Sequence, residues 1–187
     1  VNVKIFTGLA IAALLTACGG SSDHTQGPQG TWTTECINGN IKTYVFDRNA
    51  TLILEDYSDE NCTDKRSDLT LKFNTLYDPK LKTTSRGVEA SKVSLTLASD
   101  VTIPLHNNDL IEVYEIMCSQ QNWAVGQATS IMACGGGLAA VVALFDKTLP
   151  MLLYIDGNNL YTSIINEPKG DDGFPSDVNY EKPYMKQ

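Results

Sequence analysis

Two stretches of the chain alternate between apolar and polar side chains with a period of two residues. In residues 69–74 (LTLKFN) the odd-numbered positions are apolar, and residues 92–97 (KVSLTL) repeat the pattern. Because successive side chains of a strand point to opposite faces of a sheet, this period puts one face in the core and the other in water. We therefore expect two half-buried β-strands here.

Further segments of strand length lie between clusters of turn residues. They are residues 31–36, 41–46, 51–57, 110–117, 151–155 and 160–165. Two hairpins are expected, one from the second and third of these segments and one from the last two, across Asp156-Gly157. Asp78-Pro79 is taken as a turn. The pattern predicts an all-β fold, an antiparallel meander of about eight strands that closes into a small barrel or sandwich, since closure removes exposed edges.

Two regions give no clear strand pattern. Residues 138–145 (LAAVVALF) form an apolar octet without a definite period, which fits either a buried strand or a short helix at one end of the barrel. Residues 167–187 contain three prolines and the run Gly-Asp-Asp-Gly. We expect this last segment to be mostly irregular and to pack over the domain through Phe174, Tyr180 and Tyr184.

The N-terminal residues have the features of a secretory signal. Residues 1–17 (VNVKIFTGLAIAALLTA) carry one charge, Lys4, followed by an apolar run of residues 5–15. This run is shorter than the roughly 20 residues needed to cross a bilayer as a helix, so it indicates a removable signal. Leu15-Thr16-Ala17-Cys18 resembles the lipobox of bacterial lipoproteins, which implies cleavage before Cys18 and lipidation of its thiol.

Residues 18–29 then read as a lipidated cysteine followed by a flexible polar tether, and residues 30–187 as a single β domain. The residue after the lipidated cysteine is Gly19, whereas an Asp at that place is the usual signal for inner-membrane retention. We therefore expect a protein anchored by lipid to the bacterial cell envelope, at the outer membrane. Whether it faces the periplasm or the exterior is left open.

The net charge of the chain limits the kinds of molecule that it is expected to bind. The formal net charge of the whole chain is −8, and removal of Lys4 with the signal leaves −9. An acidic domain is repelled by nucleic acid and by anionic lipid surfaces, so no nucleic-acid partner is expected. The negative charge keeps the domain soluble. It would also attract a basic protein partner.

The cysteines agree with an exported protein. One of the five is used in lipidation, and the four that remain, Cys36, Cys62, Cys118 and Cys134, normally pair in an oxidising compartment. Three pairings are possible. We favour Cys36 with Cys62 and Cys118 with Cys134, because each bond closes a modest loop of neighbouring chain.

We find no grouping of residues that indicates catalysis, and we expect a protein that is not an enzyme and has no cofactor. No histidine is placed to activate a Ser or Cys nucleophile, and Gly-x-Ser-x-Gly and phosphate-loop motifs are absent from the sequence. A zinc site is not expected, since the sequence lacks Cys-x-x-Cys spacing and its two histidines, His24 and His106, lie in the tether and in a turn.

Two weaker candidates for binding remain. The carboxylates of residues 56–64, and those of Asp171 and Asp172, have the chemistry to surround calcium, but the spacing favours polar loop tips and we assign no metal. Trp32 and Trp123 are candidates for lining a ligand cavity, against the alternative that they close the core at a barrel end.

Several short motifs together resemble a known group of proteins. They are Gly30-Thr31-Trp32 with Cys36, residues 57–63 (YSDENCT), Cys118 with Trp123 and Cys134, residues 155–161 (IDGNNLY), Gly173-Phe174-Pro175 and Pro183-Tyr184. In this combination the chain resembles small bacterial lipoproteins that carry a lipocalin-like β-barrel domain. The Gly-x-Trp start is also similar to that of lipocalins. The resemblance implies a lipocalin-like barrel and no particular activity.

Three functions follow as hypotheses. The first is a membrane-tethered binding domain for a small apolar ligand or an envelope partner. The second is an acidic protein inhibitor of the lysozyme-inhibitor type, which the net charge suits. The third is a purely structural component of the envelope. An open apolar barrel interior would favour the first, since only an open interior can hold a ligand.

Overall fold

The computed structural model describes residues 28–98, 100–135, 138–144, 147–163 and 169–187. The expected signal, Cys18 and most of the tether lie outside the described residues, as does the end of the strand expected at 160–165.

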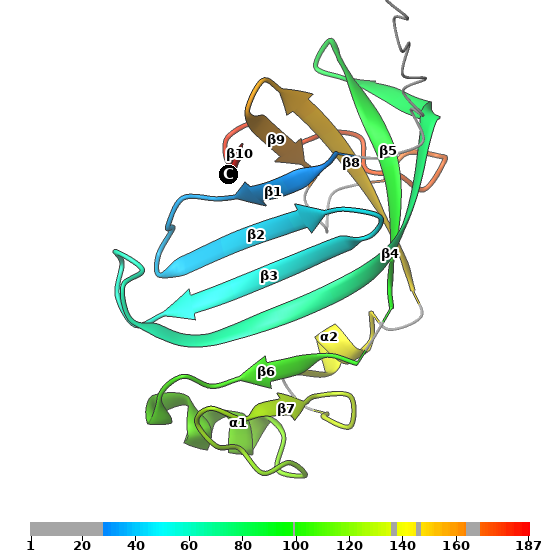
Figure 1. Ribbon diagram of the computed structural model, residues 1–187. Helices are drawn as coiled ribbons and strands as arrows, with labels where there is room; N and C mark the ends of the chain where they lie inside the picture. Colours follow the sequence, from blue (N-terminus) through cyan, green and yellow to red (C-terminus); the bar gives the residue numbers. More distant parts are fainter. Residues whose placement is uncertain (1–27, 99, 136–137, 145–146, 164–168) are drawn as a thin grey trace, which may run out of the picture.

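Eight antiparallel strands form a closed barrel, in the order β1-β10-β9-β8-β5-β4-β3-β2 (Figure 1). The barrel strands are β1 (Gly30–Thr33), β2 (Asn40–Phe46), β3 (Ala50–Tyr57), β4 (Lys65–Ser85), β5 (Val88–Leu97), β8 (Thr148–Asp156), β9 (Asn159–Thr162) and β10 (Tyr184–Lys186). This confirms the all-β class and the antiparallel barrel of about eight strands. It also decides between a barrel and a sandwich, since every barrel strand is paired on both sides.

Both hairpins expected from the sequence are present. β2 pairs with β3 from Asn40↔Asp56 to Phe46↔Ala50, and β8 pairs with β9 up to Asp156↔Asn159. Gly157, the first residue of the second turn, has φ 57°, in the left-handed region that glycine enters at low cost. Local turn chemistry therefore accounts for the β8–β9 connection.

Strand β4 is far longer than the six residues expected. It spans 21 residues, and its first half pairs with β3 while its second half pairs with β5. The turn expected at Asp78-Pro79 is wrong, because this dipeptide lies within β4, where the register with β5 shifts between Tyr77 and Lys82. A bulge accepts a proline that a regular ladder would reject, which is why a turn signal occurs inside a strand.

The strand expected at 110–117 is also wrong. Residues Asn108–Leu110 form a 3-10 helix (η1), and Ile111–Met117 form an α-helix (α1). The Asn107 side chain accepts a hydrogen bond from the backbone N–H of Asp109, which caps the start of η1. Ile111, Tyr114 and Met117 pack against the core at a spacing of three residues, a helical period that the run of apolar side chains concealed.

The barrel is closed by a strand that the sequence pattern did not indicate. β10 lies between β1 and β9. It is the eighth strand of the barrel, in place of the strand that was expected at 110–117. The C-terminal segment is therefore not irregular throughout. Tyr184 begins β10 and is buried, while Tyr180 and Phe174 precede it in loop structure.

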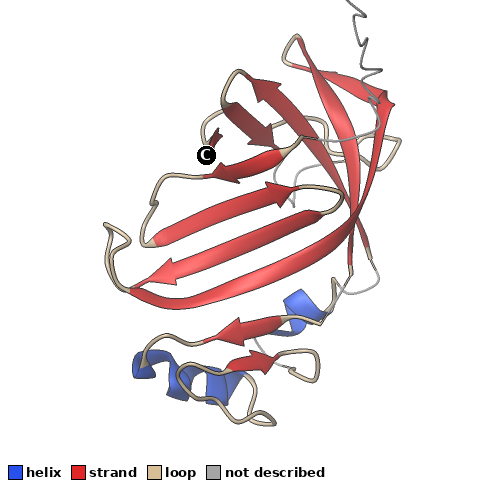
Figure 2. Cartoon of the chain, in the orientation of Figure 1, coloured by secondary structure: helices blue, strands red, loops and turns tan. Residues whose placement is uncertain are grey.

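A small lobe covers one end of the barrel. Strands β6 (Thr102–Pro104) and β7 (Ala128–Ser130) form a separate two-stranded sheet, joined by η1 and α1. Figure 1 shows this lobe with α2 (Ala139–Val142) at one end of the barrel and the β4–β5 and β8–β9 hairpins at the other. The helical alternative for residues 138–145 thus holds for α2. Figure 2 shows how little of the described part of the chain is helical.

Among the residues that the structure describes, the buried apolar side chains form two cores. The larger fills the barrel and continues into the lobe, and the smaller lies between the sheet and the C-terminal segment. The larger core includes Trp32, Phe46, Phe73, Leu95, Leu160, Ile103 and Trp123. The smaller consists of Ala90, Leu152 and Val178, with Tyr154, Tyr161 and Tyr180 packed against it. The expected packing of Tyr180 over the domain is confirmed.

Candidate functional site

A pocket opens between the barrel and the chain that follows α2. It is lined by β2, β3, β4, the start of β8, and the residues after α2 and β9. The lining residues are Tyr44, Leu52, Leu71, Phe73, Leu144, Leu149, Pro150, Met151, Ser163 and Lys169. The pocket is therefore mostly apolar, at the end of the barrel where α2 lies.

The volume of the pocket limits what it can hold. It encloses about 70 Å³, whereas pockets for drug-sized ligands usually measure about 300–1,000 Å³. The cause is that aromatic and branched side chains of the barrel strands fill most of the interior. The pocket has room for a molecule of a few heavy atoms, or for the end of a longer chain.

Tyr44 gives the pocket a polar group in its wall. The side chain is 5% exposed, and its ring stacks on Phe46 and packs against Tyr184, with ring centroids 5.4 Å and 5.1 Å away. Its hydroxyl contacts Met151 Sδ at 3.8 Å. Burial, with a smaller contribution from Tyr184, raises the pKa of Tyr44 well above its ordinary value, so the hydroxyl keeps its proton.

The lining of the pocket includes two further polar residues. Ser163 is buried, and its Oγ accepts a hydrogen bond from the backbone N–H of Leu152 at 3.0 Å. Lys169 is exposed. Leu144, Leu149 and Pro150 are only partly buried, so the pocket reaches the surface between them.

Neither tryptophan lines this pocket. Trp32 is 2% exposed inside the barrel, next to Tyr44 across the β1–β2 ladder. Trp123 lies in the lobe, where its ring packs on Tyr114 at 4.7 Å and its Nε1 donates to the Cys118 carbonyl at 3.2 Å. Both residues therefore belong to the core, the alternative considered from the sequence. The pocket-lining Tyr44 was missed because it looks like any other inward residue of an alternating strand.

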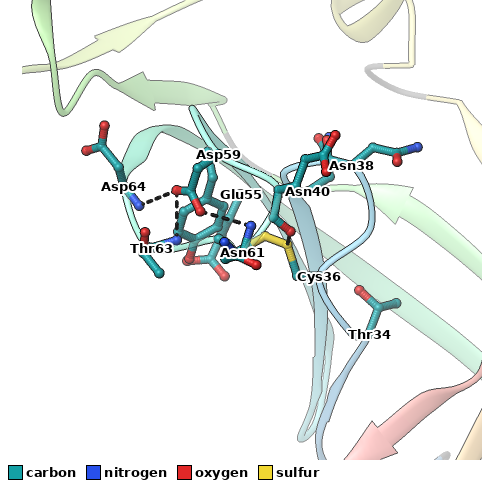
Figure 3. Close-up of a disulfide and its surroundings, with 12 residues drawn as sticks. Thr34, Cys36, Asn38, Asn40, Glu55, Asp59, Asn61, Thr63 and Asp64 are labelled. Atoms are coloured by element: carbon teal, nitrogen blue, oxygen red, sulfur yellow. Dashed lines mark hydrogen bonds between the residues drawn. A yellow bond between two sulfur atoms is a disulfide. The ribbon is translucent and has the colours of Figure 1, made fainter.

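In the acidic segment of residues 56–64, the carboxylates of Asp56 and Asp59 are engaged by neighbouring protein groups. The Asp59 carboxylate accepts hydrogen bonds from the backbone N–H groups of Asn61, Thr63 and Asp64 at 2.8–3.0 Å (Figure 3). These bonds, led by the one from Asp64, lower the pKa of Asp59. Asp56 forms an ion pair with Arg66 at 2.8 Å. The loop is therefore held by its own contacts, as expected for a polar loop tip.

The second acidic candidate is engaged in the same way. Asp172 pairs with Lys92, which lowers the pKa of the carboxyl group. Its Oδ1 also accepts a hydrogen bond from the backbone N–H of Phe174. Among the residues that the structure describes, no cluster of three or more His, Cys, Asp and Glu could hold a metal ion.

Both cysteine pairings expected from the sequence are present. Cys36 bonds to Cys62, with Cα atoms 5.9 Å apart, and Cys118 bonds to Cys134, with Cα atoms 5.0 Å apart. The first bond joins the chain before β2 to the loop between β3 and β4 (Figure 3). The second joins the end of α1 to the chain after β7.

Helix α1 presents an exposed apolar face beside acidic side chains. Val113 is 45% exposed and Ile116 is 78% exposed, while the neighbouring Glu112 and Glu115 face solvent. These four residues are called the α1 surface below.

No helix in the described part of the chain is long and apolar enough to span a bilayer. The sequence was also compared with protein-family models and with curated proteins. Neither comparison finds a match.

Proposed function

We propose that the protein is a lipid-anchored, non-enzymatic binding protein of the bacterial envelope, whose barrel takes up a small apolar ligand. The pocket at the α2 end of the barrel is the observation that carries this proposal. Its walls are supplied by Leu52, Leu71 and Phe73, so burial of apolar surface is its main source of affinity. An engineered apolar cavity of about 150 Å³ in another protein binds benzene. The pocket of about 70 Å³ is half that size, so it suits hydrocarbon groups smaller than benzene.

A thermal-shift series with cyclopropane and cyclopentane tests the binding proposal. A ligand that binds only the folded state stabilises it by about 2.7 kcal/mol at 100 times its dissociation constant, so the melting temperature should rise with concentration. Leu52→Phe fills the pocket and should remove this rise. Leu54→Phe is the matched control, because Leu54 follows on the same face of β3 and does not line the pocket. An unchanged melting temperature with every hydrocarbon contradicts the proposal.

The anchoring proposal rests on the lipobox and has a separate test. With Cys18 intact, the protein should be labelled by radioactive palmitate and should pellet with membranes after a carbonate wash. Cys18→Ser should abolish both results. A Cys18→Ser protein that still carries label and pellets would contradict lipidation at this residue.

The α1 surface favours a second candidate function, an acidic protein inhibitor. Its exposed Val113 and Ile116 offer an apolar anchor, and Glu112 and Glu115 offer charge complementary to a basic partner. Titration with a basic lysozyme tests this function. Ile116→Ser should weaken binding at least tenfold, whereas Val125→Ser, also at an exposed apolar residue of the lobe, should not. Absence of binding at low salt rejects this candidate.

A further inference from the structure

The Tyr44 hydroxyl is a buried donor with a poor acceptor. It points to the Met151 thioether at 3.8 Å, and sulfur in a thioether accepts hydrogen bonds only weakly. Leu52, Leu71 and Phe73 line the same pocket and offer no side-chain acceptor. A buried donor without a good acceptor costs free energy, and a bound oxygen atom would recover that cost.

The ring that carries this hydroxyl is held on two sides. Phe46 stacks against it and Tyr184 packs at a tilt of 58°. Tyr44 is also directly paired with Trp32 and Leu52 on the neighbouring strands. A donor fixed in this way loses little conformational entropy when it meets a ligand, which favours specific recognition.

We propose that the pocket selects small apolar molecules that carry a neutral oxygen acceptor, such as a ketone, aldehyde or ester, and that Tyr44 donates a hydrogen bond to that oxygen. This inference rests on the proposed binding function and names the chemical class of its ligand. Tyr44 serves as a specificity-determining residue, and the apolar walls supply the rest of the affinity.

A neutral acceptor fits the pocket better than a carboxylate. An ionised carboxylate in an apolar site needs several hydrogen bonds or a paired cation to offset its desolvation. The buried wall offers two hydroxyl groups, those of Tyr44 and Ser163, and the Ser163 Oγ already accepts a hydrogen bond from the Leu152 backbone N–H. Lys169 lies exposed at the rim. Since burial raises the pKa of Tyr44, the hydroxyl remains a proton donor throughout the physiological range of pH.

The test compares two molecules of the same shape. Cyclopentanone carries a carbonyl oxygen, and methylenecyclopentane carries a CH₂ group in its place. Their dissociation constants are measured in the disulfide-bonded protein from the shift of the Met151 methyl resonance. The wild-type preference for the ketone, expressed as the ratio of the two constants, should fall about tenfold in Tyr44→Phe, as expected for one buried hydrogen bond. Because the ratio is compared between proteins, the different hydration of the two molecules cancels.

Tyr161→Phe is the control variant, since it removes the hydroxyl of a tyrosine that packs against the smaller core, outside the pocket lining, and should leave the ratio unchanged. If both molecules bind and Tyr44→Phe also leaves the ratio unchanged, the inference is overturned while the proposed function stands. If neither molecule shifts the Met151 resonance, the proposed function itself fails and the inference with it.

Discussion

Replacement of Tyr184 by Ala should weaken the barrel at the strand that closes it. Tyr184 is 8% exposed, pairs with Leu160 on β9, and packs its ring 5.1 Å from that of Tyr44. Truncation of a buried aromatic side chain to Ala usually costs about 3–5 kcal/mol, of which the aromatic pair accounts for about 1 kcal/mol. We expect a loss of about 3–4 kcal/mol, a large part of the 5–15 kcal/mol that is typical of a folded domain.

Urea unfolding of the oxidised protein, followed by tryptophan fluorescence, measures this loss. Trp32 is a suitable reporter because β1 pairs directly with β10. Met185→Ala is the matched control, since Met185 is the next residue of β10 and is 37% exposed, so its truncation should cost less than about 1 kcal/mol. If Tyr184→Ala costs no more than Met185→Ala, β10 does not close the barrel in solution and the assigned topology is wrong.

Three further predictions concern stability. Gly39→Ala should cost about 1–3 kcal/mol in urea unfolding, because Gly39 has φ 71° and a Cβ there would lie 2.9 Å from the Tyr57 carbonyl oxygen; a neutral effect would contradict this close approach. Removal of the second disulfide in Cys118→Ala/Cys134→Ala should lower the unfolding free energy by about 3 kcal/mol, as expected for a loop of this size, and a neutral result in the same assay would refute the constraint. Burial raises the pKa of Tyr184 to about 12 from its ordinary 10. The contribution of Tyr184 to the unfolding free energy is therefore complete below pH 10 and is lost as the pH rises towards 12. In Tyr184→Phe the unfolding free energy should fall less steeply with pH in that window, and an unchanged slope would contradict this.

The sequence determined those features that depend on neighbouring residues. The alternation in residues 69–74 and 92–97 determined two strands. When one face is buried, apolar side chains at every second position fit a β-strand. The Asp156-Gly157 turn fixed the β8–β9 hairpin for the same local reason. The cysteine pairs were also predictable, because each closes a short loop of consecutive elements.

Other features were decided by contacts between distant parts of the chain. The run at 111–117 became a helix because Ile111, Tyr114 and Met117 pack, partly buried, against the core on one side, whereas its apolar residues also fit a strand. Residues 184–186 became a strand because β1 and β9 leave room for one more partner. A three-residue strand has no periodicity of its own to detect, so only closure of the ring could reveal it.

The candidate site belongs wholly to the second category. Tyr44 lies on β2, 107 residues before Met151, whereas Met151 and Ser163 belong to the β8–β9 hairpin and its end. Trp32 and Trp123 were candidates for lining a cavity because tryptophan is rare and large, yet both pack in the core. Whether an inward residue fills the barrel or borders a space depends on the summed volumes of its neighbours across the barrel. That sum exists only in the folded molecule, which is why the sequence indicated the barrel but not its pocket.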